Sequence, residues 1–307
     1  MSMSATLASG PSGPRPKKRF DPVRIAIYTV LVIVSLYFLV PLYVMIVTSL
    51  KGVEEIRLGN VFQLPQSPTF EPWIKAWTSA CTGLYCEGLS PGFWKSVKIT
   101  IPSVLISVIV GSLNGYSLAN WRFKGSETLF TILLIGNFLP YQVLIYPLAR
   151  LTSNMCLPGT DYCLYSTIYC VIFIHTVFGM PLLTLLFRNY FASLPNELFK
   201  AARIDGAGFW RIFIQIMLPM SLPIFVVAII LQVTGIWNDF LFGLIFAGQP
   251  NYPMTVQLNN IFNSIQGERE YNVDMAATIL TALVPLTVYF VSGRLFVRGI
   301  AAGAVKG

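Results

Sequence analysis

Long apolar runs are the feature of this 307-residue chain that most restricts what it can fold into. Apolar residues make up 55% of the sequence and charged residues only 11%, against roughly 25% charged residues in an average soluble protein. A transmembrane helix needs about 20 predominantly apolar residues. Six runs qualify, at about 25–50, 99–119, 128–148, 168–187, 221–247 and 275–296. The sequence therefore predicts an all-α membrane protein with six transmembrane helices.

The first apolar run is expected to remain as an anchor. It covers about 26 residues, whereas the core of a cleaved signal peptide covers about 7–15, and no small-residue cleavage site follows it. The preceding residues 1–22 are rich in Ser, Gly and Pro and then basic, a composition typical of disorder. We therefore predict a disordered basic tail at 1–22, a transmembrane domain at 23–296 and a C-terminal tail at 297–307.

Lys and Arg placement predicts the orientation of these helices. With the N-terminus inside, 14 of the 21 basic residues fall in inner segments, and cytoplasmic loops characteristically carry such an excess. Both termini are therefore expected in the cytoplasm. This topology also accounts for the net charge of +8, so nucleic-acid binding is not expected.

The five cysteines fall into two close pairs and one single residue. Cys81 and Cys86 lie in the first predicted outer segment, Cys156 and Cys163 in the second, and Cys170 in a span. The pairs can form disulfides in an oxidising periplasm. Reduced thiols are an equally good expectation, because spacing alone does not fix connectivity.

A hydrophilic stretch at 194–207, between two apolar runs, reads as a short amphipathic helix. Pro195 suits the first turn of a helix. Glu197 near the start and Lys200 and Arg203 toward the end match the helix dipole. Gly206 can take the left-handed conformation that ends a helix. The remaining small or apolar side chains are suited to docking into a groove of a partner: Leu198, Phe199, Ala201 and Ala202.

This stretch resembles the coupling-helix loop, or EAA loop, of bacterial ABC importer permeases. The matching positions are Ala201, Ala202, Asp205, Gly206, Ala207, Leu218 and Pro219. Lys200 stands where the family's motif usually has glutamate. The resemblance implies a type I importer fold with a coupling loop at 193–212, whose 195–207 helix contacts a separate ATPase through Glu197, Lys200, Ala201, Ala202, Asp205 and Gly206. The alternative is an ordinary amphipathic helix lying on the membrane surface.

Two further stretches resemble carbohydrate-type permeases. Trp237-Asn238-Asp239-Phe240 is similar to their W-N-[DE]-F segment, and the run 296–307 is similar to their F-V-x-G-L-x-x-G-A-V-K-G ending. The resemblance implies the second permease subunit of a maltose-type sugar importer, closest to glucose-type systems. In maltose-type members this ending reaches the interface of the ATPase dimer, which implies contacts there from Gly303, Lys306 and Gly307. A flexible cytoplasmic tail is the alternative.

Polar residues inside the apolar runs are candidates for function, because such groups are costly in a membrane. Hydroxyls of a sugar need amide or carboxylate partners and its ring stacks on aromatic faces. The candidates for the solute pathway are Gln142, Gln232, Trp237, Asn238 and Asp239. The alternative is hydrogen bonding between helices, worth about 0.6–2 kcal/mol each. That alternative is favoured for Asn114, inside the motif Gly111-x-x-x-Gly115, and for the single histidine, His175.

ATP chemistry is expected in another subunit. A phosphate-binding P-loop requires G-x-x-x-x-G-K-[ST], and the chain has no Gly-Lys dipeptide. Mg-ATP is therefore assigned to a partner ATPase. One histidine and scattered acids cannot assemble a convincing catalytic or metal site, so this chain is predicted to be a transport subunit, without a cofactor or metal of its own.

The resemblance implies an assembly in the bacterial inner membrane. Its expected partners are a second permease, forming a heterodimer, two ATP-binding cassette subunits and a periplasmic sugar-binding protein. Two alternatives remain open. One is an ion-coupled secondary transporter that uses Asp239 and His175, and the other is an ABC permease for a solute other than a sugar.

Overall fold

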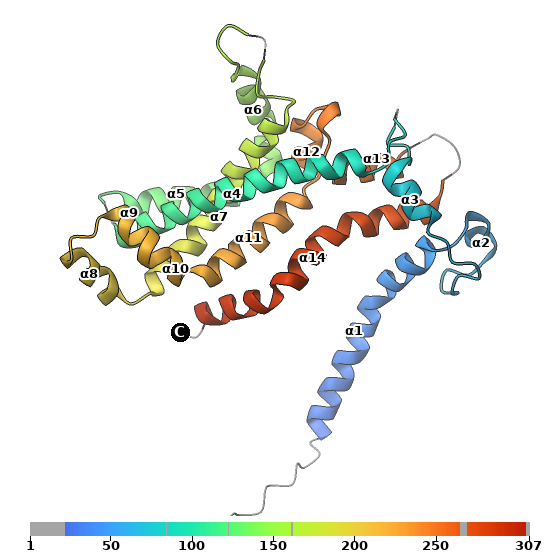
Figure 1. Ribbon diagram of the computed structural model, residues 1–307, viewed down its shortest axis with the longest axis horizontal. Coiled ribbons are helices and arrows are strands. Elements are labelled where there is room, and N and C mark those ends of the chain that lie inside the picture. The colour runs from blue at the N-terminus through green and yellow to red at the C-terminus, as the bar shows by residue number, and fades with distance from the viewer. Residues whose placement is uncertain (1–21, 84, 122, 161, 265–268, 305–307) are drawn as a thin grey trace, which may run out of the picture. The chain divides into compact units, whose positions relative to one another are not determined.

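The structure, a computed structural model, describes residues 22–83, 85–121, 123–160, 162–264 and 269–304, the stretch 294–304 as backbone only. The chain divides into two units, residues 1–44 and 45–307. Helices form the described part of both units, and the described residues contain no strand (Figure 1). The predicted disordered tail at 1–22 lies, except for Pro22, outside the described residues.

Four helices are long and apolar enough to cross a membrane. They are α1 (Pro22–Ser49), α4 (Ser90–Asn120), α7 (Ile168–Ser193) and α14 (Tyr271–Ala304), the last qualifying through Gly293. Two pairs of bent helices raise the number of candidate spans among the described residues to six if each pair is one span. The all-α membrane fold is therefore confirmed, and the third and fifth predicted spans, 128–148 and 221–247, are each interrupted.

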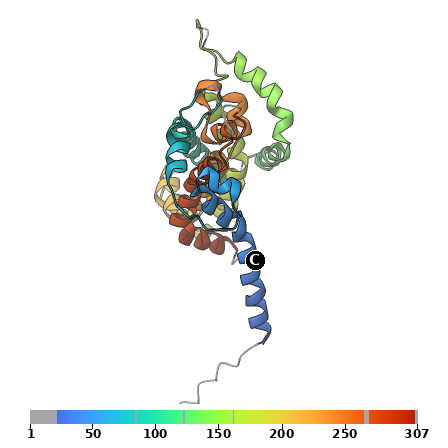
Figure 2. The same ribbon diagram turned by 90° about the vertical axis from the view of Figure 1, so that its right-hand side faces the viewer.

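The third predicted span is broken at Pro140. It consists of α5 (Ser126–Phe138) and α6 (Tyr141–Asn154), which meet at 103°. Leu139 precedes the proline and is extended, at φ −68° and ψ 130°, because the proline ring disfavours helical geometry in the preceding residue. In Figure 2, α6 lies apart from the other helices of the second unit.

The fifth predicted span is a chain of short helices. Over 221–247 it consists of α11 (Leu222–Trp237) and α12 (Leu241–Phe246), and it is preceded by α9 (Phe209–Ile212), the π-helical η1 (Phe213–Met217) and α10 (Leu218–Met220). Residues 209–220 meet α11 at an 80° bend. Within η1 the Leu218 N–H bonds the Phe213 carbonyl, and Pro219 has no N–H to continue an α-helical ladder. Hydropathy records the apolar run but not these changes of direction.

The most extensive helix packing among the described residues is between α4 and α7, and it includes the predicted Gly111-x-x-x-Gly115 motif. A Cβ atom at Gly111 would lie 2.5 Å from the Leu183 Cβ. One at Gly115 would lie 2.6 Å from the Phe187 Cβ and 2.7 Å from the Arg188 backbone nitrogen. Glycines allow this approach of backbones, which is how helices commonly associate in membranes.

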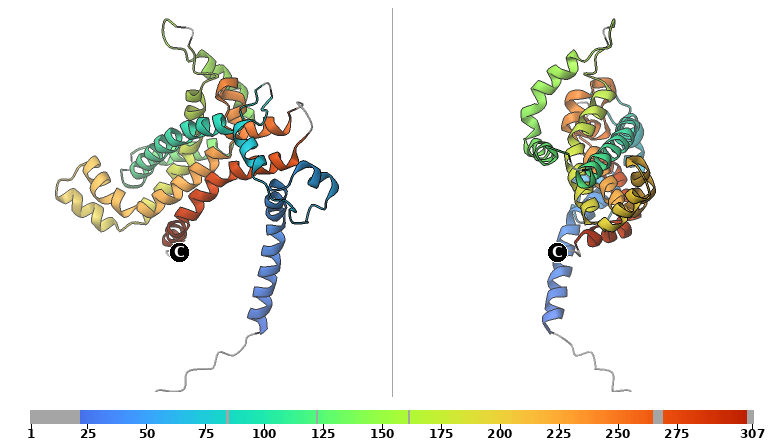
Figure 3. Two further views of the ribbon diagram at one scale, coloured as in Figure 1. Left: turned by 45° about the vertical axis from the view of Figure 1, so that its right-hand side comes forward. Right: turned by 90° about the vertical axis from the view of Figure 1, so that its left-hand side faces the viewer.

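The two ends of this helix bundle carry different elements. At one end lies α8 (Asn196–Ile204), and at the other lie α3 (Glu71–Thr78) and α13 (Met254–Phe262) (Figures 1 and 3). The short α2 (Val53–Leu58) and η2 (Gln249–Asn251) complete the described helices. Near α2, the buried Lys51 donates from Nζ to the Asn60 carbonyl at 3.0 Å, and its own carbonyl accepts from Asn272 at 2.9 Å.

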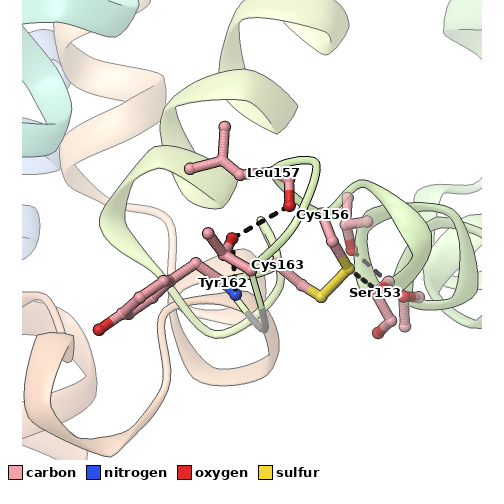
Figure 4. The surroundings of a disulfide bond; sticks show 8 residues. Ser153, Cys156, Leu157, Tyr162 and Cys163 are labelled. Atoms are coloured by element: carbon pink, nitrogen blue, oxygen red, sulfur yellow. Dashed lines mark hydrogen bonds between the residues drawn. A yellow bond between two sulfur atoms is a disulfide. The ribbon is translucent and has the colours of Figure 1, made fainter.

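Both cysteine pairs form disulfides. Cys81 is bonded to Cys86, and Cys156 to Cys163. Figure 4 shows the second bond. In the same loop, the Leu157 N–H donates to the Tyr162 carbonyl at 2.9 Å and closes a hairpin between α6 and α7. Cys170 is the remaining cysteine and is buried in α7.

This pairing predicts the result of thiol labelling. Denatured but unreduced protein should take up one alkyl group, at Cys170, and reduced protein should take up five. Mass spectrometry of the alkylated chain makes the measurement. The variant Cys156→Ser should gain one reactive thiol, at Cys163, without reduction. Five reactive thiols in unreduced wild-type protein would contradict both disulfides.

Candidate functional site

Helix α8 is the amphipathic helix predicted from residues 195–207. Pro195 sits just before its first residue, with Glu197 in the first turn and Arg203 in the last. The proline is thus the residue that caps the helix rather than part of its first turn. The two charges favour the helix through its dipole, by about 0.3–1 kcal/mol each at exposed positions.

Gly206 ends α8 in the left-handed conformation, at φ +76°. The Ala207 N–H bonds the Ala202 carbonyl at 2.9 Å, and the Gly206 N–H bonds the Arg203 carbonyl at 3.1 Å. These two bonds form a Schellman motif, which satisfies carbonyls at the helix end and strongly favours glycine at this position. The predicted role of Gly206 in ending the helix is therefore confirmed.

The inward face of α8 packs on the end of α4. Phe199 and Ala202 are buried. The rings of Phe199 and Trp121 lie 5.7 Å apart, edge to face, and the Arg203 guanidinium lies 5.0 Å from the Trp121 ring centre. Both are favourable aromatic geometries, each worth roughly 0.5–1.5 kcal/mol. These contacts hold α8 against its own chain.

An aromatic cluster continues this attachment into the bundle. The buried Tyr116 of α4 lies 4.8 Å from Phe209 and 5.3 Å from Phe213, measured between ring centres. Its hydroxyl donates to the Phe209 carbonyl at 3.3 Å. Trp121 also lies 5.5 Å from Phe209. The cluster therefore joins α8, α9 and η1 to α4. Sequence reasoning missed it, because Tyr116 and Trp121 lie far from Phe209 and Phe213 in the sequence.

The outward face of α8 is exposed and carries most of the predicted coupling residues. Ile204 is 86% exposed and Leu198 45% exposed, an unusual state for apolar side chains. The predicted coupling residues that share this exposure are Glu197, Lys200, Ala201, Asp205 and Gly206. The expected docking role of Phe199 and Ala202 needs correction, because both side chains are covered by this chain itself.

Removing the Trp121 ring should loosen α8. We expect Trp121→Ala to raise the rate of tryptic cleavage after Lys200 and Arg203 by roughly tenfold, since about 1.4 kcal/mol of lost ring contacts is a factor of ten in the detached population. Mass spectrometry of timed digests measures this rate. Trp210→Ala is the control, because Trp210 is 60% exposed. Equal cleavage rates in the two variants would show that Trp121 does not hold α8.

A second candidate site is an open cleft of ≈ 480 Å³ where α11 breaks before α12. Two of the predicted pathway residues, Asn238 and Asp239, line it. The other lining residues come from α6, α7, α11, the break and α12: Tyr141, His175, Gly235, Phe240, Leu241 and Phe242. The cleft therefore brings together residues that are about 100 positions apart in the sequence.

Asp239 is the polar centre of this cleft. Its carboxylate accepts from the backbone N–H groups of Phe242 at 3.3 Å and Gly243 at 3.0 Å, which caps the start of α12. The His175 Nε2 lies 3.6 Å from Oδ2 of the same carboxylate. The His175 ring packs edge to face on Phe242, 5.5 Å away. His175 is thus paired with Asp239 rather than isolated in an apolar core.

Three other predicted pathway residues do not line the cleft. Trp237 is only 2% exposed and its Nε1 donates to the Thr281 carbonyl at 3.0 Å, so it is a core residue. Gln232 of α11 is buried against Gly179 of α7, and its Nε2 lies where a Cβ atom on that glycine would be crowded. Gln232 is therefore a packing residue between the two helices. Gln142 is exposed on α6, next to the cleft residue Tyr141.

The remaining predicted site lies at the C-terminus. Helix α14 continues through Gly303 to Ala304, while Lys306 and Gly307 lie outside the described residues. Their contact with an ATPase stays a prediction. Among the described residues no group of three or more His, Cys, Asp or Glu side chains could hold a metal ion.

Comparisons with known proteins agree with this geometry. A family profile described as binding-protein-dependent transport system inner membrane component matches residues 103–302. A probable ABC transporter permease protein of Pyrococcus horikoshii is 35% identical over 94% of this chain and 100% of its own length. The xylose/arabinose import permease protein XacI of Haloferax volcanii is 32% identical over 92% of this chain and 93% of its own.

A solved structure has the same fold. It is the crystal structure of a bacterial ABC transporter involved in the import of the acidic polysaccharide alginate. One of its chains matches with a TM-score of 0.72 and 18% identity, over 92% of this chain and 99% of that one.

Proposed function

The chain belongs to the family of binding-protein-dependent transport system inner membrane components, and we propose that it couples a partner ATPase to sugar import through α8. As a permease subunit it is a transport component rather than an enzyme. The exposed face of α8, with Ile204 and Leu198 uncovered on a helix fixed to α4, is the observation that carries the proposal. A helix that only lay on the membrane would not need an attachment to the bundle.

Coupling then follows from the two faces of α8. The outward face docks on the ATPase, and the inward face passes its displacement to α4 through Phe199 and Trp121. The Tyr116 cluster carries the same displacement to α9 and η1. A π-helical segment is a common place for a helix to kink, and η1 leads through α10 to the 80° bend before α11. The bundle therefore alternates between two arrangements as ATP is bound and hydrolysed in the partner.

The assembly follows from the family. This chain forms half of the solute pathway, and a different permease subunit forms the other half. Two ATPase subunits bind Mg-ATP on the cytoplasmic side, next to α8. A periplasmic sugar-binding protein delivers the solute to the opposite end. The distribution of Lys and Arg supports placement in the inner membrane with both termini in the cytoplasm.

A sugar is the solute that the comparisons favour. The Haloferax volcanii relative is named for xylose and arabinose import. The sequence Trp237-Asn238-Asp239-Phe240 and the glycine-rich ending at 296–307 add to this support. Identification of the individual sugar requires the binding protein, because selection begins there.

Affinity purification of the chain from its native membranes tests the proposal. We expect a P-loop ATPase, a second permease and ATP-dependent uptake by vesicles that contain the purified complex. Mass spectrometry identifies the subunits. A chain that purifies alone, with uptake that an uncoupler abolishes, would contradict the proposal and favour an ion-coupled transporter that uses Asp239 and His175.

A further inference from the structure

The cleft at the α11–α12 break has more polar groups than a packing defect would. Asn238 is exposed in it, and its side-chain amide has no hydrogen-bond partner among the described residues. Asp239 and His175 lie on the same wall as a close pair. Irregular backbone and ionisable groups at membrane depth persist only where they are buried in protein or line a water-filled cavity. This cleft is open, so it is wet.

The shape and lining of the cleft fit a sugar. Its volume of ≈ 480 Å³ falls in the usual range for small-molecule sites, about 300–1,000 Å³. The Tyr141 ring is 43% exposed and packs edge to face on Phe242, 5.5 Å away. It therefore offers an apolar face beside the amide of Asn238 and the carboxylate of Asp239. Sugars present such alternating C–H faces and hydroxyls.

Asp239 retains acceptor capacity after it caps α12. Each of its oxygens accepts one backbone N–H, whereas an ionised carboxylate has about four acceptor positions in all. The His175 Nε2 lies 3.6 Å from Oδ2, within ion-pair distance but beyond a hydrogen bond. A hydroxyl can therefore donate to Asp239 without displacing the cap.

We propose that this cleft is a sugar-binding subsite of the transport pathway, specific for neutral sugars. Asn238 and Asp239 hydrogen-bond the hydroxyls, the Tyr141 ring supports a face of the sugar, and His175 positions Asp239. The carboxylate disfavours an acidic sugar, because like charges repel at close range. This inference rests on the proposed function as a sugar permease and assigns direct solute contact to this subunit.

Vesicle transport with the purified complex provides the first test. At saturating binding protein and sugar, Asn238→Ala should lower sugar uptake about threefold to tenfold, the equivalent of one lost hydrogen bond. ATP hydrolysis stimulated by the loaded binding protein should stay at the wild-type rate. Gln142→Ala is the matched control, an amide one residue from Tyr141 but outside the cleft. It should leave both rates unchanged.

Thiol labelling provides the second test and identifies the class of sugar. In the variant Asn238→Cys, the new thiol should be the one that reacts with a water-soluble maleimide, because Cys170 is buried and the other four cysteines form disulfides. D-glucose, D-xylose or maltose at millimolar concentration should slow this labelling several-fold. D-glucuronate should not, unless Asp239→Asn is also present. Gln142→Cys should react without protection by any of these sugars.

The two levels of the proposal fail differently. If wild-type vesicles show no ATP-dependent uptake, the proposed function is wrong, and the proposed sugar-binding subsite is then wrong as well. If wild-type uptake is normal but Asn238→Ala transports at the wild-type rate, and no sugar protects Asn238→Cys, only the subsite is wrong. Protection by glucuronate equal to that by glucose would overturn the specificity for neutral sugars.

Discussion

Replacing Gly206 with proline is expected to abolish uptake while the chain still inserts into the membrane. Proline fixes φ near −65°, and Gly206 has φ +76°. It also removes the N–H that bonds the Arg203 carbonyl. The end of α8 would then lose its Schellman motif. The exposed side chains of Ile204 and Asp205 would change direction, and the surface that docks on the ATPase would be altered. Uptake by vesicles and the amount of chain in the membrane fraction measure the two effects.

Gly125→Pro is the matched control for this experiment. Gly125 also has positive φ, +91°, it is the residue before α5, and an added Cβ there would meet no atom within 4 Å. We expect it to retain most uptake. A second coupling variant, Asp205→Arg, should also abolish uptake, although a cation at a helix C-terminus favours the helix itself. Normal uptake by both Gly206→Pro and Asp205→Arg would show that α8 does not couple this chain to an ATPase.

Gly115→Leu should have the largest effect on stability. A Cβ atom there would lie 2.6 Å from the Phe187 Cβ and 2.7 Å from the Arg188 nitrogen. The second contact is with backbone, so α4 and α7 must move apart. Overpacking of this kind costs about 3 kcal/mol, which corresponds to a Tm lower by roughly 5–10 °C. The detergent-solubilised chain is heated to a series of temperatures, and size-exclusion chromatography measures the fraction that has not aggregated. The midpoint of this loss gives the Tm.

Gly136→Leu separates this packing effect from the loss of a glycine in a membrane helix. Gly136 lies in α5 and has no atom within 4 Å of an added Cβ. Its Tm should stay within about 2 °C of the wild type. If Gly115→Leu and Gly136→Leu had the same Tm, the close approach of α4 and α7 would not be a main source of stability.

The sequence predicted the number and type of elements better than their paths. Apolar runs locate α4, α7 and α14, because composition alone decides whether a helix tolerates lipid. Composition contains no information on direction, so it gave neither the 103° break at Pro140 nor the 80° bend before α11, although the prolines there suggest kinked helices. Pro140, Pro219 and Pro223 were visible in the sequence. Proline is nevertheless frequent in straight membrane helices, so these residues alone did not locate the bends.

The candidate sites show the same division. The ends of α8 could be predicted, because Glu197, Arg203 and Gly206 act through local backbone physics. Its two faces could not. Ala201 and Ala202 are identical in kind and adjacent, yet one is exposed and the other is buried. Likewise Trp237 and Asn238 are neighbours that face a core and a cleft. Which side a residue faces depends on distant helices, and one sequence does not reveal them.

The two disulfides bear on how the chain matures. Their partners are separated by only 5 and 7 residues, and each lies in a segment that the basic residues predict to be outside. Each pair can therefore close as soon as its own segment has been exported, before the later helices are made. Mispairing between the two loops is disfavoured by the shorter loop closure within each. With the predicted topology, we expect the two disulfides to form in the order of synthesis, without reshuffling of bonds after assembly.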